Sequence, residues 1–356
     1  MATKTGRRRS RSDHAVPHPG PPHGGTVVKA RPIPALAGAL RVTSFKDGAI
    51  EQTEGTAALK AALARSGGTT WADLADPTPE QVAELTRHFG LHELIAEDIL
   101  EGNQRSKIEV TDDLIHIVLF ALRFEEEVDQ IEIDIVLGNG FLLTVHEAAW
   151  DPFEIPALRT GLATIMGRGP DHLLWAIVDA IVDGYFPFVD KLGDAIEELQ
   201  DSVIAHPDPA TLERLFALKT RLLLVRRAAT PVREIFNQLT NRELALIDSA
   251  EILYFRDVYD HLIRLTDELD NYRELVSATL DVYLSTINNQ LSLIMKRLTG
   301  VTVVLTGIAA IGGIFGMSEA GTALGGKEAP GFWLVTAFSV VLALSMAWVL
   351  RRIGWI

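Results

Sequence analysis

Two long runs without a charged residue dominate the C-terminal end of the chain. The first lies between Arg297 and Glu319, and the second lies between Glu328 and Arg351. Each is about twenty residues long, and a helix of that length spans the ~30 Å hydrocarbon core of a bilayer. Because length and lack of charge coincide twice, we expect two membrane-spanning helices rather than two buried core helices.

Basic residues beside these runs predict how the chain crosses the bilayer. Lys296 and Arg297 precede the first run, and Arg351 and Arg352 follow the second. The connecting loop has Lys327 against two glutamates. By the positive-inside rule both termini lie in the cytoplasm. We therefore expect a multi-pass protein of the cell membrane, with the lipid bilayer as one of its partners.

The residues before the first run indicate an α/β domain. Strand-forming runs predict strands at residues 40–45, 68–74, 113–124, 130–138 and 140–147. The last two are joined at Gly138-Asn139-Gly140, a hairpin signal. A helix is predicted over 78–90, with Thr78 as its N-cap and Gly90 as its stop. From about Asp171 the pattern is helical.

The last cytoplasmic helix is predicted to be unusually long, since Val232 to Thr299 contains neither glycine nor proline. Asp248 or Ser249 is the expected cap. Apolar residues recur at alternating spacings of three and four: Leu262, Leu265, Leu269, Tyr272, Val276, Leu280, Tyr283, Ile287, Leu291, Ile294 and Leu298. This is a coiled-coil seam. Continued through the first run, the helix has about 68 residues and a length of roughly 100 Å. Its expected partners are residues 212–229 and other copies of the chain.

Polar residues in and before the first run also share one helix face. This face contains Ser292, Met295, Thr299, Thr302, Thr306, Ala309 and Gly313. Hydroxyls at membrane depth suit a water-filled path, with Met295 and Leu298 as an apolar constriction that gates by dewetting. Alternatively, the threonines bond to carbonyls of their own helix. Spacing alone leaves both interpretations open.

Composition excludes several classes of protein. A net charge of −14 argues against a nucleic-acid partner, and the absence of cysteine excludes disulfides and thiolate sites. The sequence lacks a GxxxxGK[ST] loop and an HExxH motif, so we expect neither an enzyme nor an organic cofactor. Residues 1–35 form a basic, Pro- and His-rich tail that we expect to be disordered, with metal binding by its histidines as the alternative.

Six motifs in fixed order resemble the CorA family of magnesium channels: "GLHELIAEDIL", "NQRSKIEV", "YFRDVYDH", "LDVYLS", "IMKRLT" and "FGMS". The resemblance covers nearly all of the chain beyond the tail. It implies a funnel-shaped homopentamer with an α/β cytoplasmic domain, a long stalk helix that becomes the pore-lining membrane helix, and a second membrane helix outside it. The expected divisions are a tail (1–35), a cytoplasmic domain with a helical hairpin (36–248), the stalk and first membrane helix (249–317, the membrane part from about 299), an external loop (318–330), a second membrane helix (331–350) and a cytoplasmic end (351–356).

The resemblance also implies where cations bind at the outer mouth. The family has Gly-Met-Asn there, whereas this chain has Gly316, Met317 and Ser318. A serine hydroxyl is shorter than an amide and both donates and accepts hydrogen bonds, so it forms a weaker polar ring around a hydrated ion. Mg²⁺ is the expected cargo, with Co²⁺ or Ni²⁺ also possible. Alternatives are transport of Zn²⁺ or another transition metal, a membrane assembly that senses metal without conducting, and a Ser318 that only caps a helix.

The resemblance further implies regulation by Mg²⁺ bound between neighbouring cytoplasmic domains, through Glu97, Asp98, Asp179 and Asp257. Carboxylates that face each other across subunits repel, and a bound cation offsets that repulsion. Loss of the ion would loosen the assembly and open the pore. In the alternative, Asp257 pairs with Arg256 or Arg264, and the other acids are solvated.

Overall fold

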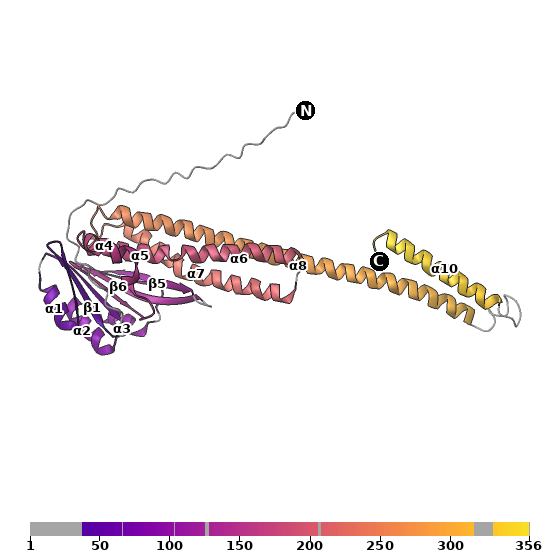
Figure 1. Cartoon of the computed structure of the whole chain (residues 1–356), viewed down its shortest axis with the longest axis horizontal. Helices are drawn as coiled ribbons and strands as arrows, with labels where there is room; N and C mark the ends of the chain where they lie inside the picture. The colour runs from indigo at the N-terminus through magenta and orange to yellow at the C-terminus, as the bar shows by residue number, and fades with distance from the viewer. Residues whose placement is uncertain are drawn as a thin grey trace, which may run out of the picture. The chain divides into compact units, whose positions relative to one another are not determined.

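The computed structural model describes residues 38–65, 67–102, 104–124, 128–205, 208–316 and 330–355. The predicted tail, residues 1–35, lies outside these residues. The described part begins with an α/β domain and continues as long helices (Figure 1).

Seven strands form one sheet in the order β2-β1-β3-β7-β6-β5-β4. They are β1 (Leu40–Lys46), β2 (Ala49–Glu54), β3 (Thr69–Ala75), β4 (Lys107–Val110), β5 (Leu114–Phe124), β6 (Val128–Gly138) and β7 (Phe141–His146). Strands β3 and β7 pair in parallel, and every other pair is antiparallel. The five predicted strands and the β6–β7 hairpin are confirmed, whereas the edge strands β2 and β4 were not predicted.

Three short helices cover one face of the sheet: α1 (Thr56–Leu63), α2 (Pro79–Phe89) and α3 (Glu93–Glu101). Helix α2 begins as predicted, because the Thr78 hydroxyl accepts a hydrogen bond from Gln81 N at 3.3 Å and the Gln81 side chain bonds back to Thr78 N. It ends at Gly90, whose φ of 67° is the left-handed conformation that glycine favours. This confirms both predicted ends of the helix.

The opposite face of the sheet packs against the helical half of the chain. That half contains α4 (Pro156–Met166), α5 (Pro170–Asp183), α6 (Phe186–Ala205) and α7 (Pro209–Asn241), preceded by the short 3-10 helix η1 (Pro152–Glu154). Alternation along the strands explains the two cores. Ile133 and Ile135 of β6 join the helical core, whereas Val136 joins the core under α2 and α3.

Helix α8 (Ile252–Gly316) is continuous over 65 residues. It begins later than predicted. An Asp248 side-chain oxygen accepts a hydrogen bond from Ala250 N at 2.9 Å, so Asp248 caps the turn that precedes the helix. Asp248 N in turn donates to the Asp171 carboxylate at 2.9 Å, which fixes this turn against α5. The expected cap at Asp248 or Ser249 is therefore wrong by about one turn.

The apolar seam of α8 has two environments. Leu262 and Leu265 are 0% exposed, and the seam stays wholly or partly covered as far as Ile287 by packing against α6 and α7. From Leu291 onward it is open, with Ile294 58% exposed. The first part of the seam therefore has partners within the chain, as predicted for residues 212–229, and the second part has none among the described residues.

Two described segments are long and apolar enough to cross a membrane. In Pro170–Ala205, 61% of the most apolar stretch of residues is buried inside the protein, as is typical of helices in a protein core. In Ile252–Gly313 the buried share is 6%. Helix α10 (Pro330–Arg352) lies beside the C-terminal part of α8 (Figure 1). The fold is therefore an α/β domain followed by a long helix with an exposed apolar end and a second apolar helix.

Candidate functional site

All the predicted pore positions lie on the C-terminal part of α8. They are Ser292, Met295, Leu298, Thr299, Thr302, Thr306, Ala309 and Gly313, and each is exposed in a single chain. The two apolar members are among the most open, with Met295 67% and Leu298 65% exposed. Large apolar side chains left open at the end of a helix need a partner outside the chain.

The face of α8 that contacts α10 is a different one. Its half-buried or buried positions are Gly300, Val304, Gly307 and Ile311. A Cβ atom built at Gly307 would lie 3.5 Å from the Met346 sulfur of α10, an ordinary van der Waals contact. With about 100° of rotation per residue, this face and the row from Thr302 to Gly313 point to roughly opposite sides of the helix. Helix α10 therefore leaves the predicted pore face uncovered.

Thr302 forms the bond that the alternative interpretation of the hydroxyl row expects. Its Oγ1 donates to the Leu298 carbonyl oxygen at 2.8 Å, which is a bond within its own helix. A hydroxyl that donates one hydrogen bond keeps lone pairs that can accept others. The intrahelical bond therefore orients the Thr302 oxygen and still allows it to accept from water.

The predicted outer mouth lies at the limit of the described residues. Gly316 is the last residue of α8. Met317 and Ser318 lie outside the described residues.

A cluster of ionisable side chains joins α5 to α8. Asp179 of α5 meets Asp257 and His261 of α8, and one ligand atom from each lies within 4.8 Å of the others. Burial raises the pKa of Asp179 to about 6, and the charges of Asp183 and Asp257 add to this rise. A carboxyl group whose charge is opposed by its neighbours is a suitable partner for a cation.

Asp257 does not form the ion pair proposed as an alternative. Within the described residues it has no salt bridge to Arg256 or Arg264. The Arg264 guanidinium instead lies over the Phe186 ring, 5.2 Å from its centroid. His261 Nδ1 lies 3.7 Å from Asp183 Oδ1, so the histidine is close to acids from both helices.

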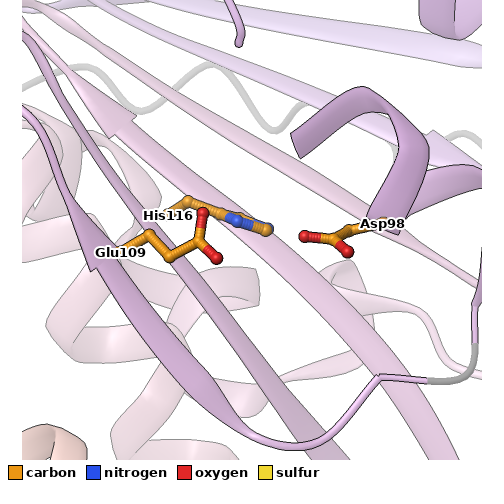
Figure 2. A group of neighbouring side chains, drawn as sticks. All are labelled: Asp98, Glu109 and His116. Carbon is orange, nitrogen blue, oxygen red and sulfur yellow. The ribbon is translucent and has the colours of Figure 1, made fainter. Parts of the chain in front are cut away.

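Of the two remaining predicted acids, only Asp98 lies in another cluster. Glu97 is exposed on α3. The Asp98 side chain is 15% exposed and accepts a hydrogen bond from Lys107 Nζ at 2.5 Å. Asp98 also lies near Glu109 and His116 (Figure 2). Within one chain the structure therefore brings Asp179 and Asp257 together and places Asp98 with different partners, so it is not simply a solvated acid.

Four ionisable residues of these clusters were not predicted from the sequence: Lys107, Glu109, His116 and His261. Only His261 had a local signal. It follows Asp257 by four residues on a helix, and residues at that spacing lie on one face. Glu109 and His116 become neighbours through the β4–β5 register, which places them directly opposite each other. That register is not visible in the spacing of the residues along the chain.

Comparison with known proteins gives consistent results. A family model described as CorA-like Mg²⁺ transporter protein matches residues 66–352. The chain is 33% identical over 242 residues to the cobalt/magnesium transport protein CorA of Thermotoga maritima, which covers 67% of this chain and 69% of that protein. It is 23% identical over 299 residues to the zinc transport protein ZntB of Yersinia pseudotuberculosis, covering 83% and 90%.

A solved structure extends the similarity to the fold. The complete structure of the CorA magnesium transporter from Methanocaldococcus jannaschii matches with a TM-score of 0.73 and 26% sequence identity. The match covers 90% of this chain and all of the other. The similarity therefore includes the α/β domain and extends into the apolar helices.

Proposed function

Because the chain belongs to the CorA-like Mg²⁺ transporter family, whose members move divalent cations, we propose that it is a homopentameric membrane channel with Mg²⁺ as its main cargo. Both termini lie in the cytoplasm, and the ion path runs along α8. The observation that supports this most directly is the exposed hydroxyl row of α8, which faces away from α10.

Assembly explains why that row is exposed in one chain. Copies of α8 around a common axis would turn Thr302, Thr306 and Gly313 towards the axis and leave α10 on the outside. Hydroxyl oxygens at membrane depth then line water instead of lipid. The open apolar residues Leu291 and Ile294 would contact neighbouring copies, as expected for a seam that has lost its partners within the chain.

The same helix provides a gate and its link to the cytoplasmic domain. Met295 and Leu298 would form apolar rings just below the membrane span, and a narrow apolar ring closes a pore by excluding water. Because α8 is one helix from Ile252 to Gly316, a movement of its packed first half is transmitted to these rings.

Cytoplasmic Mg²⁺ is the regulatory ligand in this proposal. Asp179 and Asp257 of one subunit would face Glu97 and Asp98 of its neighbour, and an ion bound directly or through its waters would hold them together. Burial is the main cause of the raised pKa of Asp179, and the negative charges of Asp183 and Asp257 add to it, as expected for a place that would attract a cation. When Mg²⁺ is lost, repulsion between the acids separates the subunits and widens the pore.

The residue at position 318 is the reason to test a second cargo, Zn²⁺. Ser318 stands where the family has asparagine at the outer mouth, and one relative is a zinc transport protein. A ring of serine hydroxyls holds a hydrated ion less firmly than a ring of amides. Zn²⁺ or another transition metal is therefore the alternative cargo, and an assembly that only senses metal is the alternative function.

Flux of Mg²⁺, Co²⁺, Ni²⁺ and Zn²⁺ into liposomes tests these proposals. We expect wild-type protein to conduct Mg²⁺, Ser318→Asn to increase the preference for Mg²⁺ over the other ions, and Ser318→Ala to weaken cation capture. Equal uptake profiles for the three proteins would show that Ser318 is not the filter. A pentamer that conducts none of the four ions would favour the sensing assembly, whereas monomers or dimers in native mass spectrometry would contradict the pentamer.

A further inference from the structure

A second ligand cluster lies beneath α3, away from the Asp179 cluster. Asp98 from α3, Glu109 from β4 and His116 from β5 point towards one another, and one ligand atom from each lies within 4.8 Å of the others (Figure 2). Glu109 and His116 are paired directly across β4 and β5, so their side chains share one face of the sheet. Helix α3 covers this face and adds Asp98 from above.

His116 is buried, and only one of its two ring nitrogens has a hydrogen-bond partner among the described residues. Its side chain is 0% exposed, and its Nε2 lies 2.8 Å from Asp134 Oδ1. Among the described residues Nδ1 has no hydrogen-bond partner. A carboxylate accepts hydrogen bonds, so we assign the proton of the neutral ring to Nε2, which leaves a lone pair on Nδ1. A buried acceptor without a donor is uncommon in folded proteins, so this nitrogen is available to bind a ligand.

The contact between His116 and Asp134 resembles the outer shell of a metal site. Histidines that bind metals usually donate their second N–H to a carboxylate or a carbonyl, which fixes the tautomer and orients the ring. Asp134 is 4% exposed, so this contact is shielded from water. The arrangement leaves the other nitrogen unprotonated, which is the form that binds a metal.

The carboxyl group of Glu132 adds a further buried acid near this cluster. Glu132 is 7% exposed, and one of its oxygens accepts from Gln104 N at 3.0 Å. Its second oxygen, Oε1, has no partner within the described ranges. Burial, followed by the charge of Asp134, raises the pKa of Glu132 to about 7, and Asp98 adds to this rise. A cation at this place would be stabilised by several carboxylates at once.

Lys107 currently supplies the positive charge. Its Nζ lies 2.5 Å from Asp98 Oδ2 and 2.9 Å from Glu109 Oε1, so the ammonium bridges the two carboxylates of the cluster. The Lys107 side chain is 29% exposed and flexible, and its ammonium can turn towards solvent. The ammonium therefore marks a place for a cation and competes with any other cation for the same oxygens.

We propose that Asp98, Glu109 and His116 form a binding site, within one subunit, for a first-row transition-metal dication such as Zn²⁺ or Co²⁺, which replaces the Lys107 ammonium. One imidazole nitrogen and two carboxylates suit these ions. Mg²⁺ prefers oxygen ligands and retains its waters, so it is a poor match for a buried imidazole. The site is independent of the proposed pentamer and of Asp179, but it shares Asp98 with the proposed Mg²⁺ sensor. A transition metal bound here withholds Asp98 from that sensor.

The test is metal binding by the full chain in detergent. All proteins compared have the tail histidines His14, His18 and His23 replaced by alanine, so that the tail adds no signal. Equilibrium dialysis measures Zn²⁺ per chain, and the visible absorption of bound Co²⁺ reports whether nitrogen is a ligand. We expect His116→Phe and Glu109→Gln each to lose one equivalent of Zn²⁺ and the corresponding Co²⁺ band.

Lys107→Gln distinguishes a metal site from a structural cluster. It removes the ammonium that competes with Zn²⁺ for the oxygens of Asp98 and Glu109, so Zn²⁺ binding should tighten by at least about tenfold. Two positive charges a few Å apart repel by more than the free energy that corresponds to a tenfold change in affinity. Asp257→Asn is the matched control. It should weaken the response to Mg²⁺ and keep the Zn²⁺ equivalent that His116→Phe removes, whether or not the His261 cluster also takes up Zn²⁺, so the two sites can fail separately.

Unchanged Zn²⁺ binding in both His116→Phe and Glu109→Gln would overturn the proposal. So would a Lys107→Gln protein whose Zn²⁺ affinity does not rise. Because His116 is buried, its variant is accepted only if its thermal unfolding midpoint stays close to that of the parent. Glu109, at a partly exposed edge strand, supplies the same test with less risk to folding.

Discussion

Asp179 of α5 and Asp257 of α8 lie far apart in sequence and meet beside His261, each with a ligand atom within 4.8 Å of the others. This contact joins the helix that packs on the sheet to the helix that extends into the apolar segment. An ion held there would act on both helices at once. The pair is therefore a suitable place at which a bound cation could influence α8.

The raised pKa of Asp179 predicts how pH changes the response to Mg²⁺. Its pKa is about 6 in the folded protein against an ordinary value of 3.8, so the folded state binds this proton more tightly than the unfolded state. The resulting stabilisation is complete below pH 3.8 and is lost as pH rises through about 6. Mg²⁺ binds the deprotonated carboxylate, so its effect on the thermal unfolding midpoint should be larger at pH 7.5 than at about pH 5.

Two variants test this assignment. Asp179→Asn should remove most of the pH dependence of the Mg²⁺ effect, because amide and carboxylate differ mainly in charge. Asp183→Asn removes a neighbouring charge that raises the pKa of Asp179, so it should move the transition to lower pH. Differential scanning fluorimetry in detergent measures both. An Mg²⁺ shift in Asp179→Asn that keeps the wild-type pH profile would assign the titration to another group.

Protease protection tests the proposed sensor as a whole. Millimolar Mg²⁺ should protect the wild-type cytoplasmic domain, because subunits held together by the ion expose fewer cleavage sites. Asp98→Lys combined with Asp257→Lys should abolish this protection, since each change places a positive charge where the cation would bind. Native mass spectrometry must show that the double variant is still a pentamer. Mg²⁺-dependent protection that survives in it would exclude these residues as the sensor.

The sequence predicts the central strands well because their signals are local. Strand β6 has an apolar run, and glycines in its hairpin allow the turn, so both were predicted. Strand β2 is an edge strand whose residues are exposed or half-buried, and it lacks an apolar pattern. Strand β4 is only four residues long, Lys107–Val110, and depends on its pairing with β5. Neither edge strand has a signal strong enough to predict without the sheet.

The candidate sites show the same limit. The hydroxyl row on α8 follows from helical spacing, and the seam was predicted over its whole length. Where the seam loses its cover, between Ile287 and Leu291, depends on the ends of α6 and α7. The meeting of Asp98 with His116 requires both the β4–β5 register and the position of α3. Such contacts between distant segments are set by tertiary structure.

Close packing between α6 and α8 predicts a destabilising substitution. A Cβ atom built at Gly193 would overlap the Tyr272 hydroxyl and would lie 2.8 Å from its Cζ. Tyr272 is also held by a hydrogen bond to Glu268 at 3.0 Å, so it moves at a cost. Gly193→Ala should therefore lower stability by about 1–3 kcal/mol. The thermal unfolding midpoint in detergent is the measurement.

Gly161 of α4 offers a matched control for this substitution. A Cβ atom there would lie 3.8 Å from Ile165 Cδ1, an ordinary contact, and alanine favours a helix over glycine by about 1 kcal/mol. Gly161→Ala should leave the midpoint unchanged or raise it. Combining Gly193→Ala with Tyr272→Phe should restore part of the loss, because the overlapping hydroxyl is gone. Equal effects of the two alanine substitutions would refute the steric explanation.

The gate proposed at Met295 can be tested by making it polar. Met295 is 67% exposed in one chain, and in the pentamer it would form an apolar ring that excludes water. Met295→Ser should let water remain in the ring, so Mg²⁺ flux should persist at millimolar cytoplasmic Mg²⁺, at which the proposed gate of the wild-type channel should be closed. Leu293 is 44% exposed and lies about 200° away around α8, so Leu293→Ser is the matched control. We expect several-fold higher flux in liposomes for Met295→Ser and wild-type flux for Leu293→Ser. If both variants close normally at high Mg²⁺, the constriction lies elsewhere along α8.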